Sequence, residues 1–120
     1  MSIPPEALQK LLQEIEQKAA FSQQQIGIVK AQMAAKTRES RMLQLTSSEV
    51  SSLPKDTHVY EGVGKMFVLT PTEDVKQRLS KESQELKSEM ANLDKKLHYL
   101  ETTYKNSRAS MEQLFQSRGG

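Results

Sequence analysis

The sequence contains no cysteine and no tryptophan, and aromatic residues make up only 5% of its 120 positions. The absence of cysteine excludes a disulfide framework and a metal site built from thiolates. Apolar residues reach only 36% of the chain, whereas about half is typical of globular domains. The sequence therefore does not predict a large compact core.

Long apolar runs and clusters of one charge are also missing. No stretch approaches the roughly eighteen consecutive apolar residues of a membrane span, and no early basic segment leads into a signal-peptide core. The net charge is only +2, with both signs spread evenly along the chain, whereas a nucleic-acid binder usually carries a basic stripe. We expect an intracellular, cytoplasmic protein that binds neither membranes nor nucleic acid.

The second half of the chain contains a sustained heptad repeat. Two interleaved seven-residue series contain Leu79, Leu86, Met90, Leu93, Leu97, Leu100, Tyr104, Met111 and Leu114. Such a repeat over about five heptads is typical of a coiled coil. Thr70-Pro71-Thr72-Glu73 supplies a capping hydroxyl, a proline for the first helical position and a first-turn glutamate. These residues predict a helix over 71–117 that ends at Gly119-Gly120.

The first half carries a weaker copy of this heptad repeat, whose residues form the seam along which two helices would pack. Its apolar members are Leu8, Leu12, Ile15, Ala19, Ile26, Val29, Met33 and Leu43, and polar residues at Ser22, Lys36 and Ser40 interrupt it. The pattern predicts a helix over 5–45, and two such helices predict a mainly α fold built on an antiparallel two-helix coiled coil. The preferred register opposes Leu12 with Leu114, Ile26 with Leu100 and Met33 with Leu93. A register one heptad away stays open.

Residues 46–70 lie between the two helices and differ from both. Thr46-Ser47-Ser48-Glu49 has the pattern of another helix start, which predicts a separate short helix stopped before Pro54. The next stretch, VYEGVGKMFVLTP, is rich in β-prone residues. Gly64-Lys65 fits a two-residue type II′ turn, which pairs Val63 with Met66 and Gly62 with Phe67. The sequence thus predicts one central β-hairpin.

Both faces of this hairpin are largely apolar. A two-stranded hairpin alone is marginal in water, and the coiled coil is too narrow to cover both faces. We therefore predict that the hairpin pairs with strands of other chains.

Nothing in the sequence predicts catalysis or a cofactor. A phosphate-binding loop needs a glycine five residues before Gly64, a Ser or Thr after Lys65 and a βαβ unit around them. Here Val59 and Met66 occupy those two positions, and no βαβ unit is predicted. His58 and His98 stand far apart in different elements, and no nucleophile with a neighbouring base or metal-ligand spacing is present. We expect no enzyme activity, no cofactor and no metal.

The order of these elements, with the hairpin motif Tyr60-Glu61-Gly62-Val63-Gly64-Lys65-Met66-Phe67, resembles the β-type prefoldin subunits of eukaryotes over nearly the whole chain. The resemblance implies one domain over 1–120. It also implies an ATP-independent hetero-hexamer of two α-type and four β-type prefoldin subunits, whose hairpins join an intersubunit β-barrel. The residues implied in subunit assembly are Tyr60, Val63, Met66, Phe67, Val68 and Leu69.

The resemblance further implies that the coiled-coil tips capture unfolded client proteins, such as actin and tubulin, and deliver them to the cytosolic group II chaperonin. Both chain ends would form the tip, and its residues are Ile3, Leu8, Leu11, Leu12, Met111, Leu114 and Phe115. Leu11 and Phe115 lie off the seam, whereas the other helical members have the alternative role of closing its last layers. A coiled-coil scaffold or tether in another assembly is the second functional hypothesis.

Overall fold

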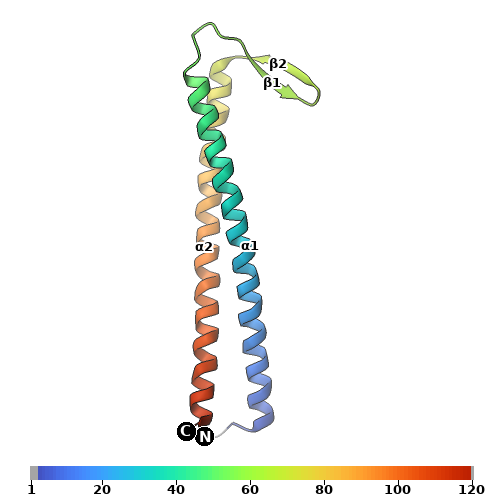
Figure 1. Cartoon of the computed structure of the whole chain (residues 1–120), viewed down its shortest axis with the longest axis vertical. Helices are drawn as coiled ribbons and strands as arrows, with labels where there is room; N and C mark the ends of the chain where they lie inside the picture. Colours follow the sequence, from blue (N-terminus) through green and yellow to red (C-terminus); the bar gives the residue numbers. More distant parts are fainter. Residues whose placement is uncertain (1–2, 120) are drawn as a thin grey trace. The chain divides into compact units, whose positions relative to one another are not determined.

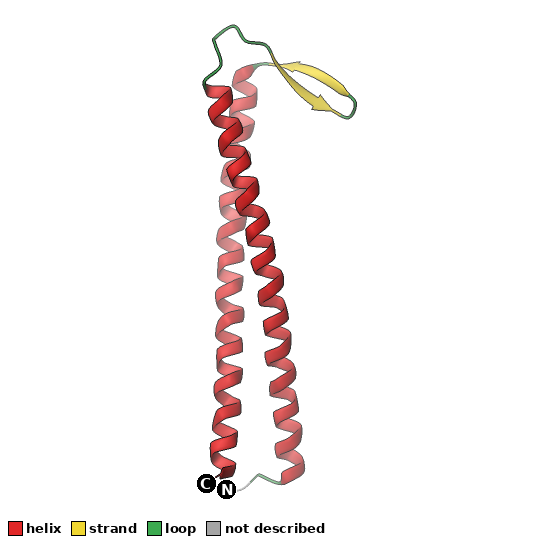
Figure 2. Cartoon of the chain, in the orientation of Figure 1, coloured by secondary structure: helices red, strands yellow, loops and turns green. Residues whose placement is uncertain are grey.

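The computed structural model describes residues 3–119, which form two long helices and one β-hairpin (Figures 1 and 2). The elements in chain order are α1 (Pro5–Ser51), β1 (Val59–Val63), β2 (Met66–Thr70) and α2 (Thr72–Gly119). The predicted mainly α fold with one central hairpin is confirmed, while the predicted stop at Gly119-Gly120 includes Gly120, which lies outside the described residues. The chain forms two compact units, residues 3–33 with 92–119 and residues 34–91, and each is described by itself.

The unit of residues 3–33 and 92–119 is held together along the predicted seam. Every member of the two heptad series in this unit is buried or half-buried, and Val29 is fully buried. The polar seam residue Ser107 is buried too, and its hydroxyl donates to the carbonyl of Thr103 at 2.9 Å. This bond to the preceding turn of its own helix offsets the cost of burying the hydroxyl.

Two pockets in this unit are lined by residues of both helices, and the residues they bring together are those that the preferred register places side by side. Ile15 of α1 lines one pocket with Ser110 and Leu114 and another with Ser107 and Ser110. In the preferred register Ile15 faces the middle of this group. A shift by one heptad would instead move its partner to Tyr104 or beyond Ser117.

The unit of residues 34–91 has a small apolar core where three elements meet. Val50 of α1 packs with Val75 and Leu79 of α2, and the half-buried Leu43 and Val59 lie against them. Val59 is the first residue of β1, so this cluster attaches the base of the hairpin to both helices.

The helix predicted to end near Leu45 does not end there. The Thr46 hydroxyl, predicted to cap a new helix, instead donates to the carbonyl of Met42 at 2.8 Å. A hydroxyl bonded to the preceding turn is compatible with an uninterrupted helix. The separate short helix after residue 45 was therefore a wrong prediction.

The apolar stripe explains why α1 continues. Ser47 and Val50 follow Leu43 in steps of four and three, and both are at least half-buried. Burial of Val50 in the core favours extension of the helix by a further turn and a half. The helix ends at Ser51, shortly before Pro54, because a proline disfavours the helical conformation of the residue before it.

The start of α2 also differs from the prediction. The amides of Asp74 and Val75 donate to the carbonyl of Pro71 at 3.1 and 3.2 Å, so Pro71 occupies the N-cap rather than the first helical position. Thr70, the predicted cap, is the last residue of β2, and its hydroxyl bonds to a carbonyl within that strand. The strand therefore includes Thr70, which had been predicted to cap the helix.

The hairpin has the predicted register and turn. Val63 pairs with Met66, Gly62 with Phe67, and three further pairs continue toward the helices. Gly64 has a φ of +61°, whereas no non-glycine residue in the described part of the chain has a positive φ. A type I′ turn needs positive φ at both central residues, so the turn is of type II′.

One polar seam position in the 34–91 unit connects the helices through charge. The Lys36 ammonium of α1 lies 2.7 Å from a carboxylate oxygen of Glu89 in α2, and 3.7 Å from one of Glu39. The hydrogen bond to Glu89 is the largest of the effects that raise the pKa of Lys36 above its ordinary value of 10.5. A residue that interrupts the apolar seam thus still bridges the two helices.

Candidate functional site

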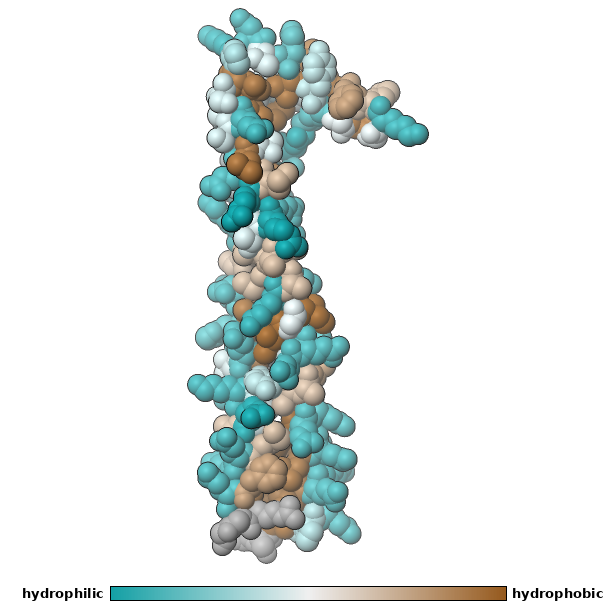
Figure 3. All heavy atoms as spheres, viewed as in Figure 1, coloured by the Kyte–Doolittle hydropathy of each residue, from teal (hydrophilic) through white to brown (hydrophobic). Residues whose placement is uncertain are grey.

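The six hairpin residues predicted to mediate assembly are all exposed. Their exposed fractions run from 43% to 78%, and the members are Tyr60, Val63, Met66, Phe67, Val68 and Leu69. Figure 3 shows apolar side chains, coloured brown and tan, on the outside of the hairpin. Singly scattered exposed apolar side chains are normal, but six on two five-residue strands form a patch that is typical of an interaction surface.

The register places these side chains on both faces of the hairpin. Tyr60, Phe67 and Leu69 share one face, where a side chain at Gly62 would stand 3.9 Å from the Phe67 ring. Val63, Met66 and Val68 share the other face. The sheet in the described part of the chain has only two strands, so each strand also has an edge with unpaired backbone groups.

Two contacts hold the hairpin against the helices of its own unit. Val59 packs into the small core with Val75 and Leu79. Two residues along the same strand, the Glu61 carboxylate forms an ion pair with the guanidinium of Arg78 in α2. Both contacts use the same face of β1, because residues two apart in a strand point the same way.

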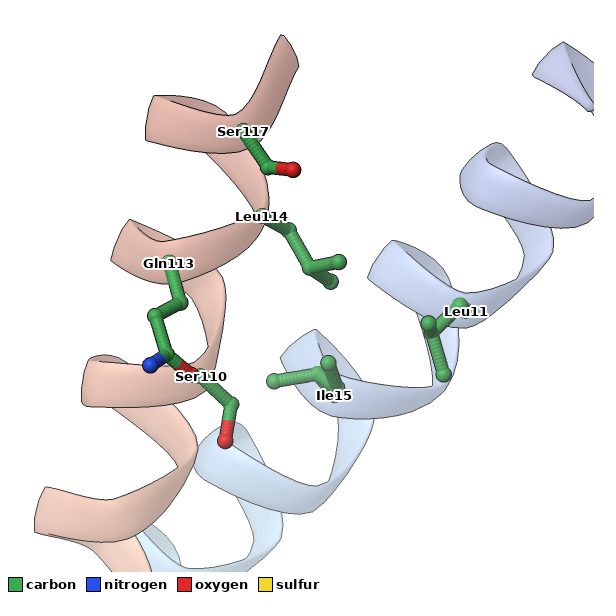
Figure 4. Close-up of a pocket in the computed structure, with 6 residues that line it drawn as sticks. All are labelled: Leu11, Ile15, Ser110, Gln113, Leu114 and Ser117. Carbon is green, nitrogen blue, oxygen red and sulfur yellow. The ribbon is translucent and has the colours of Figure 1, made fainter. Parts of the chain in front are cut away.

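The predicted tip residues lie in the other unit, near both ends of the described chain. One pocket there is lined by Leu11 and Ile15 of α1 and by Ser110, Gln113, Leu114 and Ser117 of α2. Figure 4 shows Ile15 and Leu114 pointing toward each other from the two helices, with Leu11 one turn before Ile15 in α1. Leu11 was predicted off the seam; it is exposed, yet it also lines this pocket.

A second pocket gathers tip residues from the start of the chain alone. Ile3, Leu8 and Leu12 line it together with Pro5 and Gln9.

Phe115 lines neither of these pockets and is exposed, as its position off the seam predicted. The four seam residues of the tip are half-buried, so closing the last seam layers remains their alternative role. These four are Leu8, Leu12, Met111 and Leu114. The client-binding role of the tip stays a prediction.

Sequence reasoning assigned Ile15 only to the seam and did not include it in the tip. Its place in the pocket follows from its spacing, because Ile15 lies one turn after Leu11 and three residues after Leu12, which the preferred register sets opposite Leu114. Extending the predicted tip by one helical turn beyond Leu11 and Leu12 would have included Ile15.

The described residues offer little else for chemistry. No three of their histidine, aspartate and glutamate side chains are grouped closely enough to hold a metal ion. None of the described helices combines the length and the apolar character needed to cross a membrane.

The sequence matches the family model of prefoldin subunits over residues 7–118. The chain belongs to the prefoldin subunit family. It is 33% identical to a probable prefoldin subunit 1 of Schizosaccharomyces pombe over 92% of the chain and 98% of that relative. It is 27% identical to prefoldin subunit 1 of Homo sapiens over 92% of the chain and 91% of the human protein. The predicted resemblance to eukaryotic prefoldin subunits is confirmed.

A solved structure supports the fold. The crystal structure of the prefoldin beta subunit from Thermococcus strain KS-1 matches this chain with a TM-score of 0.80 and 24% identity. The match covers 93% of this chain and 94% of the archaeal one, so both long helices and the single hairpin belong to the shared fold. Family membership makes the chain a subunit of a prefoldin chaperone, which assembles with other prefoldin subunits.

Proposed function

We propose that this chain is a β-type subunit of a hetero-hexameric co-chaperone that captures unfolded proteins without ATP. The observation that carries this proposal is the hairpin, with six exposed apolar side chains on two faces and an unpaired edge on each strand. A surface of this kind is unfavourable in water, and pairing with strands of neighbouring subunits buries the side chains and completes the backbone hydrogen bonds.

The proposed partners are two α-type and three further β-type prefoldin subunits. Their hairpins would join with this one in an intersubunit β-barrel, because closing a sheet into a barrel removes its free edges. The described part of this chain contributes a single two-stranded hairpin, so this chain cannot close such a barrel alone.

The proposed client site is the tip, formed by the apolar residues near the chain ends. Ile3, Leu11 and Phe115 are exposed there, and two open pockets are lined with leucine and isoleucine. Each such surface binds weakly and with little selectivity, and several tips acting together hold a client by avidity. We propose actin-like and tubulin-like clients, handed over in the cytoplasm to the group II chaperonin, with no enzymatic step and no cofactor.

The alternative is a coiled-coil scaffold or tether in another assembly. Such a protein would also need the helical seam. It would have no need for an apolar hairpin at its centre or for exposed apolar side chains near its ends.

Native mass measurement of co-expressed subunits tests this proposal. The chain is produced with an α-type prefoldin subunit and the other β-type subunits, and the expected product is a stoichiometric hexamer. Phe67→Ser should remove this chain from the hexamer, because the Phe67 ring is 78% exposed on the outer face of the hairpin. Tyr99→Ser is the matched control, since Tyr99 is 70% exposed but lies on α2.

The control variant should assemble like the unaltered chain. A stable dimer that ignores the other subunits would support the tether. Equal assembly by the Phe67 and Tyr99 variants would refute the assembly role of the hairpin.

A further inference from the structure

Glu61 is the only charged residue in either strand of the hairpin. It lies in the middle of β1 and is mostly buried, and its Oε1 atom is fully enclosed. That oxygen meets a guanidinium nitrogen of Arg78 as an ion pair, although it accepts no well-directed hydrogen bond from a described group. The Nε atom of the same arginine lies 3.7 Å from Glu82, one turn further along α2.

A carboxylate at this position is not explained by stability of the hairpin. Glutamate is depleted in strands, whereas valine or threonine suits a half-buried strand position better. Enclosing a carboxylate oxygen also costs free energy unless an opposite charge compensates it. A polar pair that contributes little to stability can still select one arrangement among several, as single polar residues do in coiled coils.

The geometry of the unit shows which arrangement is selected. Val59 and the one-residue link from β2 to α2 through Pro71 both hold the ribbon at its base, so they constrain the rest of the ribbon less against rolling. The pair between Glu61 and Arg78 adds a second point about 7 Å further along the same face of β1. With both contacts made, the base of that face is turned to α2. Val63, Met66 and Val68 on the same face stay exposed, as do Tyr60, Phe67 and Leu69 on the opposite face.

We infer that the ion pair between Glu61 and Arg78 is a positioning device that fixes the orientation in which the hairpin is presented to neighbouring prefoldin subunits. The inference rests on the proposed assembly role of the hairpin. Its predicted effect is on the fraction of chains that are competent to assemble, because the apparent affinity falls in proportion to that fraction.

The expected magnitude is modest. Arg78 is about half exposed, and exposed ion pairs contribute little to free energy. Loss of the pair should therefore weaken association with the other subunits by about two- to fivefold at low salt. The difference should shrink at high salt, because salt screens exposed charges.

The experiment measures hairpin orientation and assembly separately. The chain has no cysteine, so Lys65→Cys in the turn and Ser88→Cys on α2 allow two spin labels to be placed without further changes. The width of the distance distribution between the labels is measured in the full chain. The variants are Glu61→Gln, Arg78→Gln, the double variant and Glu82→Gln as the matched control.

Glu61→Gln and Arg78→Gln should each broaden the distribution, and the double variant should be no broader than either, because both remove the same interaction. Glu82→Gln removes a neighbouring charge of the same sign without touching the hairpin and should change nothing. An unchanged width in Glu61→Gln, or a distribution already broad in the unaltered chain, overturns the inference.

Affinity for the co-expressed subunits is then measured with the same variants but without labels. Broadening together with unchanged affinity would show that orientation does not control assembly, which overturns the inference while the proposed function stands. Normal assembly of the Phe67→Ser chain would overturn the proposed function, and the orientation measurement would still decide whether the pair fixes the hairpin.

Discussion

Replacing Leu11 and Phe115 by serine should weaken client capture while leaving assembly intact. Both side chains lie near the ends of the helices, in the unit that does not contain the hairpin. Leu11 is 37% exposed and Phe115 is 53% exposed, so this fraction of each residue is available for a client to cover. Neither residue belongs to the two heptad series, so the seam itself is left unaltered.

The exposed fractions set the size of the effect. Fully burying one such side chain is worth about 1.5–3 kcal/mol, so the exposed parts of the two together offer about 2 kcal/mol. This corresponds to a loss of about 30-fold in affinity for a client held by this tip alone. The loss in the complete complex should be smaller, because other tips keep their contacts.

The assay is the binding of a fluorescently labelled unfolded protein to the assembled complex, together with suppression of its aggregation after dilution from denaturant. Phe21→Ser with Ile28→Ser is the matched control. These residues are 60% and 44% exposed on α1 in the same unit, so their replacement removes a similar apolar area elsewhere. Equal loss of binding in the control variant would refute the assignment of capture to the tip, as would undiminished binding by the tip variant.

Three further predictions concern stability and are checked by thermal or denaturant unfolding followed by circular dichroism. Val29→Ala should lower the free energy of unfolding by about 2 kcal/mol, because it removes two buried methyl groups and leaves a cavity; no loss would show that the seam does not carry the stability. Gly64→Ala should destabilise the hairpin by about 1 kcal/mol because of its positive φ, whereas Gly27→Ala within α1 should stabilise by about as much; effects of equal sign would contradict this. The stabilisation from Lys36 should be complete below pH 10.5 and lost as the pH rises through its raised pKa, and Glu89→Gln should reduce that loss.

The seam and the hairpin could be predicted because each rests on a strict local period. Heptad spacing fixes which residues face the partner helix, and every predicted seam position of the described helices is at least half-buried. The hairpin register follows from the turn, because Gly64 in the first central position leaves only one pairing of the flanking residues.

The errors lie where a short motif competes with packing over a longer range. The Thr46 motif has the pattern of a helix start, but Val50 continues the stripe, and its burial with Val75 favours one uninterrupted helix. The Thr70 motif failed for a similar reason, since pairing with Val59 draws Thr70 into the sheet. Local capping is worth about 1 kcal/mol, which burial of one apolar side chain can exceed.

The ion pair between Glu61 and Arg78 has no sequence signal at all. The two residues are far apart in the chain, and their contact depends on the angle at which the strand leaves the helices. Charge patterns within one helix can be predicted from spacing, as for Arg78 and Glu82 at i and i+4, but a contact between a strand and a helix cannot.

Because the hairpin is exposed in the single chain, the amount of soluble chain in a cell should depend on the amount of its partner subunits. A copy synthesised without partners carries a segment, residues 66–70, with high β-propensity, no proline and no charge, exposed on an unpaired strand. Segments of this kind promote aggregation. Cells that make this chain in excess of its partners should therefore accumulate insoluble or degraded orphan subunits, so that its soluble level is set by the scarcest subunit of the complex rather than by its own synthesis.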